Sequence, residues 1–284
     1  MDNYSHSSTG LAHRRRRLTD QETEQRMLQT AVAMVNRTGL TVSLDHISFE
    51  DLIHDADVAR SAVYRRWPYK DLFFSDLVRE LAKDATPTLV NDEMAMMKRL
   101  IAERHDWIET PEKRQGLVLE LFRQLSLLDF EAVYESPQWR TYIALHATFM
   151  SLVDGDLRQQ VQLALSQTEH NRIARIASSW KQISALFGYR LRPELGASFE
   201  TLATLLNAKL HGLALMALSM PEIATHRFQA RPFEAIAEAE WSVTAMGTAI
   251  LATAFLEPDP TVEWNDERIA SVRRALELWT PPKA

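Results

Sequence analysis

The sequence predicts an all-α protein with a small helical head followed by a larger helical body, and three observations point to this class. The 284-residue chain is rich in Leu, Ala, Glu, Gln and Arg, residues that favour helices. It holds only 8 Gly and 11 Pro, and several of the prolines stand between apolar segments. The alternation of apolar and polar residues that is typical of strands is rare. A hydrophobic content of 46% is enough for a packed core.

The first helix is expected over about 20–38. Thr19 and Asp20 offer an N-cap, and Glu22 follows where the helix dipole favours an acid. Gly39 offers the stop. Apolar residues recur at helical spacing between these signals: Met27, Leu28, Ala31, Met34 and Val35.

Two short helices are expected next. Ser48 and Asp51 resemble a capping box that opens the helix in ISFEDLIHDA. A tight turn at Asp57 then leads to a third helix over about 59–65. Trp67-Pro68 ends it, because proline cannot continue a helix.

A fourth helix is expected to begin near Tyr69 or Asp71 and to run to about 83. Beyond Pro87, proline and glycine separate the expected helices of the body. These are placed at about 88–107, 111–129, 137–152, 156–187, 193–220, 233–256 and 265–279.

Charge is distributed unevenly along the chain. Residues 1–70 hold ten basic and nine acidic side chains, whereas the remainder carries a net charge of −7. An acidic body is repelled by phosphates, while a locally basic face can still dock on them. There is no cysteine, no apolar signal segment and no apolar run long enough to span a membrane. We therefore expect a cytoplasmic protein.

The stretch ADVARSAVYRRWPYK, residues 56–70, combines basic and aromatic side chains after a short helix. Three short helices, with a tight turn before a basic third helix, describe a helix-turn-helix. The third helix of this motif enters the DNA major groove and the second crosses the backbone. We predict base contacts from Arg60, Ser61 and Arg65, and phosphate contacts from Ser48, Tyr64 and Lys70. Trp67 is expected to pack inward.

The same region resembles the TetR/AcrR family of bacterial transcriptional regulators over about residues 24–77. RMLQTAVAMVNRTGL, ISFEDLI and ADVARSAVYRRWPYKDLF carry the resemblance. The residues that match the family pattern in kind and spacing are Ala56, Val58, Val63, Tyr64, Trp67 and Lys70. The resemblance implies a DNA-binding head and a C-terminal domain that forms a dimer and binds a small molecule. Ligand binding then releases the dimer from a palindromic operator by changing the separation of its two heads.

The chain departs from that family pattern at several positions. Asp57 replaces the glycine that the family pattern has in the turn. Ala59 replaces the serine that caps the third helix, and Ile53 replaces a small alanine. About four extra residues, 43–46, lengthen the link before the second helix. Asp tolerates a positive φ better than most residues, so the turn survives. The departures bear on which DNA sequence is read more than on DNA binding itself.

We divide the chain into an Arg-rich arm (1–19), a DNA-binding head (20–70) and a ligand-binding and dimerisation body (71–284). The arm carries Arg14, Arg15, Arg16 and Arg17. Such an arm either enters the minor groove, as in homeodomains, or remains a solvated tail that adds only non-specific attraction.

Two long apolar segments, near 197–220 and 233–256, are expected to form the homodimer contact. Both are rich in Ala, Gly and Ser, which let helices approach closely, and two from each chain would make a four-helix bundle. The alternative is that both lie in the core of a large monomer.

The candidate effector site is drawn from aromatic and polar-tipped residues of the middle helices. They are Trp107, Phe122, Trp139, Tyr142, His146, Phe149, Met150, Trp180 and Phe187. Met and aromatic residues at helical spacing are also what an ordinary core contains. His146 stands out, because a polar atom on an apolar face needs a partner. Such a pocket would suit a mostly hydrophobic effector with one or two polar groups.

The sequence shows no recognisable enzyme signature: no glycine-rich phosphate loop, no Gly-X-Ser-X-Gly and no His-Glu-X-X-His. We expect no catalytic residue, no metal and no cofactor. Two alternatives stay open, an all-α enzyme with residues scattered over several helices and an interaction module whose basic head docks a protein.

Overall fold

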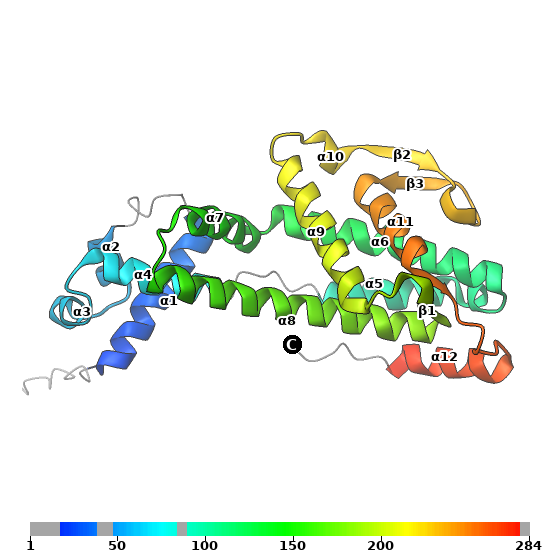
Figure 1. Ribbon diagram of the computed structural model, residues 1–284, viewed down its shortest axis with the longest axis horizontal. Helices are drawn as coiled ribbons and strands as arrows, with labels where there is room; N and C mark the ends of the chain where they lie inside the picture. Colours follow the sequence, from blue (N-terminus) through cyan, green and yellow to red (C-terminus); the bar gives the residue numbers. More distant parts are fainter. Residues whose placement is uncertain (1–17, 39–47, 84–89, 279–284) are drawn as a thin grey trace, which may run out of the picture.

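A computed structural model describes residues 18–38, 48–83 and 90–278 and confirms the all-α class with a helix-turn-helix head (Figure 1). The molecule is elongated, with the head at one end and the larger helical body at the other. The arginines of the arm, 14–17, and the extra residues 43–46 lie outside the described residues. Within the described ranges, no helix combines the length and the apolar character needed to cross a membrane.

The head consists of α1 (Asp20–Thr38), α2 (Phe49–Asp55) and α3 (Arg60–Arg66), followed by α4 (Lys70–Lys83). The predicted caps form. The Thr19 hydroxyl accepts from the Glu22 amide at 3.1 Å, and the Glu22 carboxylate accepts from the Thr19 amide at 2.8 Å. The Ser48 hydroxyl accepts from the Asp51 amide at 3.2 Å. Local sequence signals therefore fix where these helices begin.

The body is built from the remaining helices, of which α8 is the longest and runs between head and body (Figure 1). Thr110 and Ser136 cap α6 and α7, each with proline at the start of the helix. The bounds are α5 Val90–Glu103, the 3-10 helix η2 His105–Ile108, α6 Pro111–Glu135, α7 Pro137–Ser151, α8 Asp156–Leu186, α9 Phe199–Ala217, α10 Glu222–Thr225, α11 Val243–Phe255 and α12 Asp266–Leu278.

Two small antiparallel sheets are the main departure from the predicted elements. β1 (Tyr189–Leu191) pairs with β4 (Leu256–Pro258), and β2 (Arg227–Ala230) pairs with β3 (Ala239–Ser242). The prediction of one helix over 233–256 is therefore wrong for its first ten residues.

Backbone geometry explains where the two late helices begin. Phe233 and Glu234 have φ values of 54° and 61°, a left-handed conformation that no α-helix continues, so α11 begins only after the Ser242 cap. The helix expected from 193 begins at Phe199. The short 3-10 turn η3 (Pro193–Leu195) ends at Gly196 with φ 56°, and Ser198 then caps α9.

Among the residues that the structure describes, the buried apolar side chains form three clusters. The first joins the head to the body, because Met27, Val63 and Trp67 of the head share it with Tyr142 and Leu165 of α7 and α8. The second lies at the far end, where α5, α6 and α12 meet. The third packs α6 against α11 and the β2–β3 hairpin. The core is thus continuous from α1 and α3 into the middle of the body.

Candidate DNA interface and effector site

The apolar face of α2 and α3 fixes the helix-turn-helix against α1. Leu52, Val63 and Trp67 are fully buried, and Ile53 is nearly so, which confirms Trp67 as a core residue. Asp57 has φ 51°, so it takes the left-handed turn position as predicted. Ala59 precedes α3 in an extended conformation and makes no side-chain cap. The first N–H groups of α3 are therefore left without a side-chain cap from this residue.

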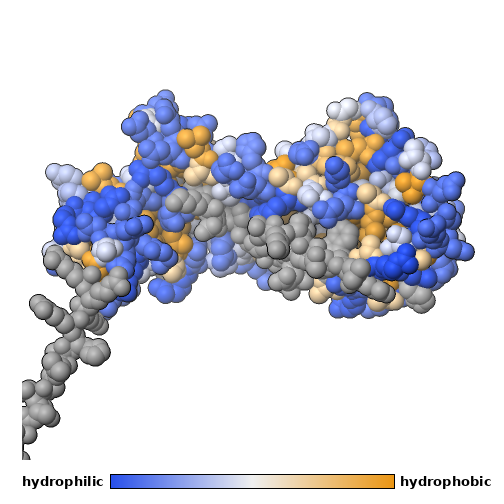
Figure 2. Space-filling model, turned by 90° about the horizontal axis from the view of Figure 1, so that it is seen from below, coloured by the Kyte–Doolittle hydropathy of each residue, from blue (hydrophilic) through white to orange (hydrophobic). Residues whose placement is uncertain are grey.

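The opposite face of α3 is exposed and basic. Arg60, Ser61, Tyr64 and Arg65 all lie on it. Lys70 begins α4 nearby and is half-buried, with its Nζ 4.8 Å from the centre of the Phe74 ring. Seen from below, the head is covered mostly by hydrophilic residues (Figure 2). One helix thus presents most of the side chains predicted to touch DNA.

The two arginines of this face and the Tyr64 hydroxyl each have an acidic partner within the head. An Arg60 Nη2–Oε1 distance of 2.5 Å joins Arg60 to Glu50, and the Tyr64 hydroxyl donates to the same Glu50 oxygen at 2.8 Å. Arg65 forms an ion pair with Asp20. Exposed pairs of this kind contribute about 0–1 kcal/mol. Phosphates or base edges can therefore replace the acids without a large loss of stability.

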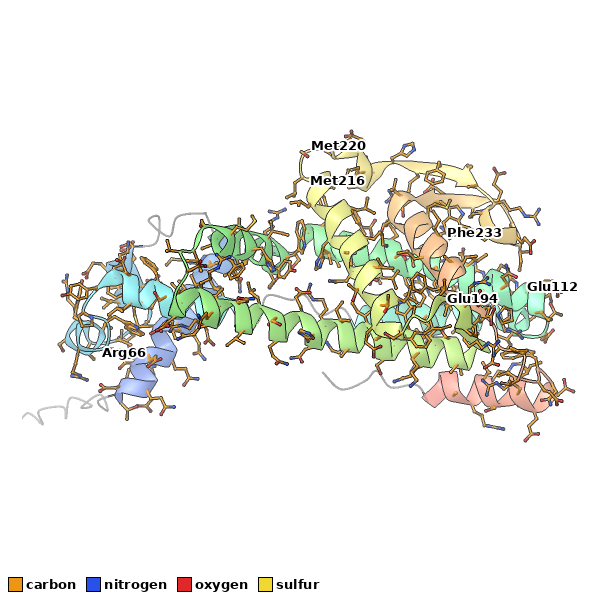
Figure 3. All side chains as sticks on the ribbon, in the orientation of Figure 1. Arg66, Glu112, Glu194, Met216, Met220 and Phe233 are labelled. Atoms are coloured by element: carbon orange, nitrogen blue, oxygen red, sulfur yellow. The ribbon has the colours of Figure 1, made fainter. Side chains whose placement is uncertain are left out.

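Arg66 has a structural role that the sequence did not indicate. It donates to Glu24 of α1 at 2.9 Å and to Asp76 of α4 at 3.1 Å (Figure 3). Asp76 also accepts from the Trp67 indole at 2.8 Å. The hydrogen bond with Glu24, followed by the charges of Glu24 and Asp76, raises the pKa of Arg66 despite partial burial. Arg66 thus ties the end of α3 to α1 and α4.

Tyr69, like Arg66, is a residue of the head for which the sequence predicted no contact. Its side chain is 73% exposed, directly before Lys70 at the start of α4. A phenol at this place presents a hydroxyl beside the predicted phosphate contact. In the sequence, only its position between Pro68 and Lys70 could have indicated such a contact.

The residues predicted for the effector site fall into two groups. Trp139, Tyr142, His146 and Phe149 lie on α7, of which all but His146 belong to the first cluster. Trp107, Phe122, Phe187 and Trp180 lie around the second, with Phe122 and Trp180 stacked at 5.0 Å. Met150 is 77% exposed. The structure therefore does not bring these residues into one site.

A buried polar cluster surrounds Tyr142, between α7, α8 and α9. The Arg172 guanidinium lies 4.9 Å from the centre of the Tyr142 ring, and its Nη1 is 3.1 Å from His211 Nε2. Glu169 Oε1 lies 3.7 Å from Arg172 Nη1. His146 Nδ1 lies 2.9 Å from the Tyr142 carbonyl, and the two rings are 4.2 Å apart. Charged, aromatic and imidazole groups thus meet inside an otherwise apolar region.

Burial dominates the protonation of this cluster. It lowers the pKa of His211 to about 4, with the positive charge of Arg172 acting in the same direction. Burial, together with Glu169, raises the pKa of Tyr142. The neutral forms of both rings are therefore the stable ones at neutral pH. Sequence reasoning found Tyr142 and His146 but not the three partners, because those come from other helices.

Two neighbouring helices carry an apolar face that no other described part of the chain covers. On α9 the exposed residues recur at helical spacing: Leu205, Ala208, Gly212 and Leu215. Ile250, half exposed, and Ala254 continue an exposed stripe on α11, which packs against α9 (Figure 1). A methyl group placed on Gly212 would meet no atom within 4 Å. This face lies on the two segments expected to form the dimer.

No family model and no curated protein sequence matches the chain. The solved structures that are similar to it include three with sequence identities of 16% or less and TM-scores of 0.40 or less. SmeT, from Stenotrophomonas maltophilia, solved with triclosan, is 16% identical over 85% of this chain and 99% of its own, with a TM-score of 0.40.

The other two are described as TetR regulators. One from Vibrio parahaemolyticus is 13% identical over 83% of this chain and 99% of its own, with a TM-score of 0.38. TylP from Streptomyces fradiae is 14% identical over 93% and 94%, also with a TM-score of 0.38. Similarity at this level assigns no function to the chain. A function has to be argued from the chain's own residues.

Proposed function

We propose that the protein is a ligand-responsive transcriptional repressor that binds palindromic operator DNA as a dimer. The observation that carries this proposal is the outer face of α3, where Arg60, Ser61, Tyr64 and Arg65 stand exposed on a helix-turn-helix. A helix bearing basic and hydroxyl side chains on its free face suits the major groove. Ser48 and Lys70 flank it as phosphate contacts.

The uncovered face of α9 and α11 supports the dimer. Leu205, Leu215 and Ile250 would be buried against the same residues of a second copy. Ala208 and Gly212 let the two copies of α9 approach closely. Two heads related by a two-fold axis then meet two half-sites of an operator, which makes the operator palindromic.

The polar cluster around Tyr142 supports a place for the effector. Its surroundings are apolar, while Tyr142, His211 and Arg172 supply a few polar groups, a composition that suits a mostly hydrophobic ligand with one or two polar atoms. Trp139 adds a buried indole N–H that has no hydrogen-bond partner among the described residues.

The same region contacts the head, which gives an effector a route to the DNA-binding helices. The Thr141 hydroxyl lies 3.3 Å from Asn36 of α1, and α4 packs against both α7 and α8. A ligand that shifted α7 or α8 would therefore shift α1 and α4, and with them the separation of the two heads.

Selection of bound duplexes from a random DNA pool tests the proposal. We expect the full-length protein to enrich a palindromic motif, and the Arg60→Ala, Tyr64→Ala double variant to lose it. Arg274→Ala, which removes an exposed charge from α12, should enrich the same motif as the wild type. Failure of the wild type to enrich any motif at low salt would contradict the proposal and favour a protein-docking head or an enzyme.

A further inference from the structure

The C-terminal helix α12 closes the far end of the body, and the proposed function gives it no role. It lies beside the ends of α6 and α8, opposite the head (Figure 1). Val272 is fully buried in the second apolar cluster, and Ile269 packs against it. The loop before α12 places Trp264 in the same region. α12 therefore covers a set of side chains that would otherwise face solvent.

Two arginines border the Trp264 ring beneath this helix. Arg114, in the first turn of α6, is only 7% exposed, and its guanidinium carbon lies 3.8 Å from the ring centre. Arg268 of α12 approaches the same ring at 5.8 Å. The ring itself is fixed, because its Nε1 donates to the Ile108 carbonyl at 2.7 Å. Two positive charges are thus held near one indole.

Part of the hydrogen-bonding capacity of these arginines is unused. Arg268 Nη2 donates to the Ala185 and Leu186 carbonyls at 2.7 and 3.3 Å. Its Nε is buried without a partner, as are Nε and Nη1 of Arg114, counting partners only within the described ranges. Buried donors are rarely left unpaired in native proteins, and such a group points to a water or an ion.

The groups nearest to Arg114 only partly balance its positive charge. Tyr189 of β1 is the hydrogen-bonding neighbour of Arg114. A phenol is neutral at physiological pH, and burial raises the pKa of Tyr189 further. Glu112 acts on Arg114 through its charge alone, because it is exposed and residues two positions apart do not share a helix face. Burial lowers the pKa of Arg114; Tyr189 and Glu112 oppose this shift, and the charge of Arg268 adds to it.

We propose that Arg114, Arg268 and Tyr189 form a binding site for a small oxyanion of the carboxylate or phosphate class, closed by α12. Guanidinium groups are the preferred partners of such anions, and they stack on aromatic rings while doing so. A bound oxyanion would accept from the unused N–H groups and from the Tyr189 hydroxyl. It would also offset the repulsion between the two cations.

Calorimetric titration of the full-length protein with sodium phosphate and, separately, sodium acetate tests this site. Ionic strength is held constant with chloride. We expect one saturable site per chain for at least one of the two anions. Arg268→Gln and Arg114→Met should each weaken that binding by at least about tenfold, because each removes a charged donor. Arg274→Gln removes a charge from the exposed side of α12 and should bind like the wild type.

Thermal unfolding of each variant shows whether it is folded before titration. If Arg114→Met does not fold, Arg268→Gln still tests the site. Arg268 is only partly buried, so its replacement is expected to leave the protein folded. Saturation by phosphate alone assigns the phosphate class, and saturation by acetate alone assigns the carboxylate class. The proposal is overturned if neither anion saturates the wild type, or if Arg268→Gln binds as tightly as Arg274→Gln.

Discussion

At the residue scale, Glu50 holds the two side chains that are best placed to meet DNA. One carboxylate oxygen accepts from both Arg60 and Tyr64. In the proposed complex with DNA, both donors would leave Glu50, and its negative charge would then face phosphates. We predict that Glu50→Gln lowers the dissociation constant for operator DNA about two- to fivefold, because it removes a competing partner and a repulsive charge. Fluorescence anisotropy with the selected duplex measures this.

Asp55→Asn is the matched control for that prediction. Asp55 lies on the same helix and carries the same charge, but its partner is His54 and not a residue of α3. It should change the dissociation constant less than Glu50→Gln does. Equal effects of the two substitutions would show that only the net charge of the head matters.

At the element scale, Lys209 joins α9 to α11 through its ammonium group. Nζ donates to the Thr248 hydroxyl at 2.6 Å, to the Thr244 hydroxyl at 3.2 Å and to the Thr244 carbonyl at 3.1 Å. Gly247 leaves room for the lysine stem, since a methyl group there would lie 3.1 Å from its Cδ. Burial lowers the pKa of Lys209 to about 8, although the charge of Asp129 opposes the shift.

This lowered pKa predicts a stability that rises with pH. Between pH 8 and the ordinary lysine pKa, the unfolded chain binds a proton that the folded chain has lost, so raising the pH favours folding. From pH 8 to pH 10 the free energy of unfolding should gain about 2 kcal/mol from this group. Lys209→Met, compared with the wild type by urea unfolding, should lack that gain. Parallel pH profiles would contradict the prediction.

Elements that depend on local signals could be predicted from the sequence, whereas those that depend on distant partners could not. Thr19, Ser48 and Asp57 place the helices of the head within a few residues, and all three take the roles expected of them. β1 pairs with a strand more than sixty residues later in the chain, and three residues show no periodicity. Phe233 gives no sign in the sequence of its left-handed backbone.

The same reason limits the prediction of sites. The residues of α3 that are predicted to face DNA lie within one short helix, so their spacing suffices to place them on one face. Arg172 and His211 stand on different helices and form a buried cluster only after α8 and α9 pack together. A polar residue on a long helix is expected at the surface by default. Only the fold reveals which of them are enclosed.

At the scale of the whole molecule, the proposed recognition of a palindromic operator requires two copies to associate through α9 and α11. Ile250 is half exposed near the middle of α11, on a face where the chain offers no covering element within its described part. We predict that Ile250→Glu yields a monomer, because a carboxylate at the centre of an apolar interface has no partner. Light scattering after size-exclusion chromatography measures the mass of the particle.

Leu163→Glu separates loss of the interface from a general effect of a surface charge. Leu163 is 71% exposed and lies on α8, which is not one of the two helices of the proposed contact, so this variant should remain a dimer. A monomeric Ile250→Glu should also bind the palindromic duplex at least about tenfold more weakly, since one head reaches only one half-site. If Ile250→Glu remained dimeric and bound normally, the two-fold contact would have to lie on another face of the body. The effector would then have to alter the separation of the heads through helices other than α9 and α11.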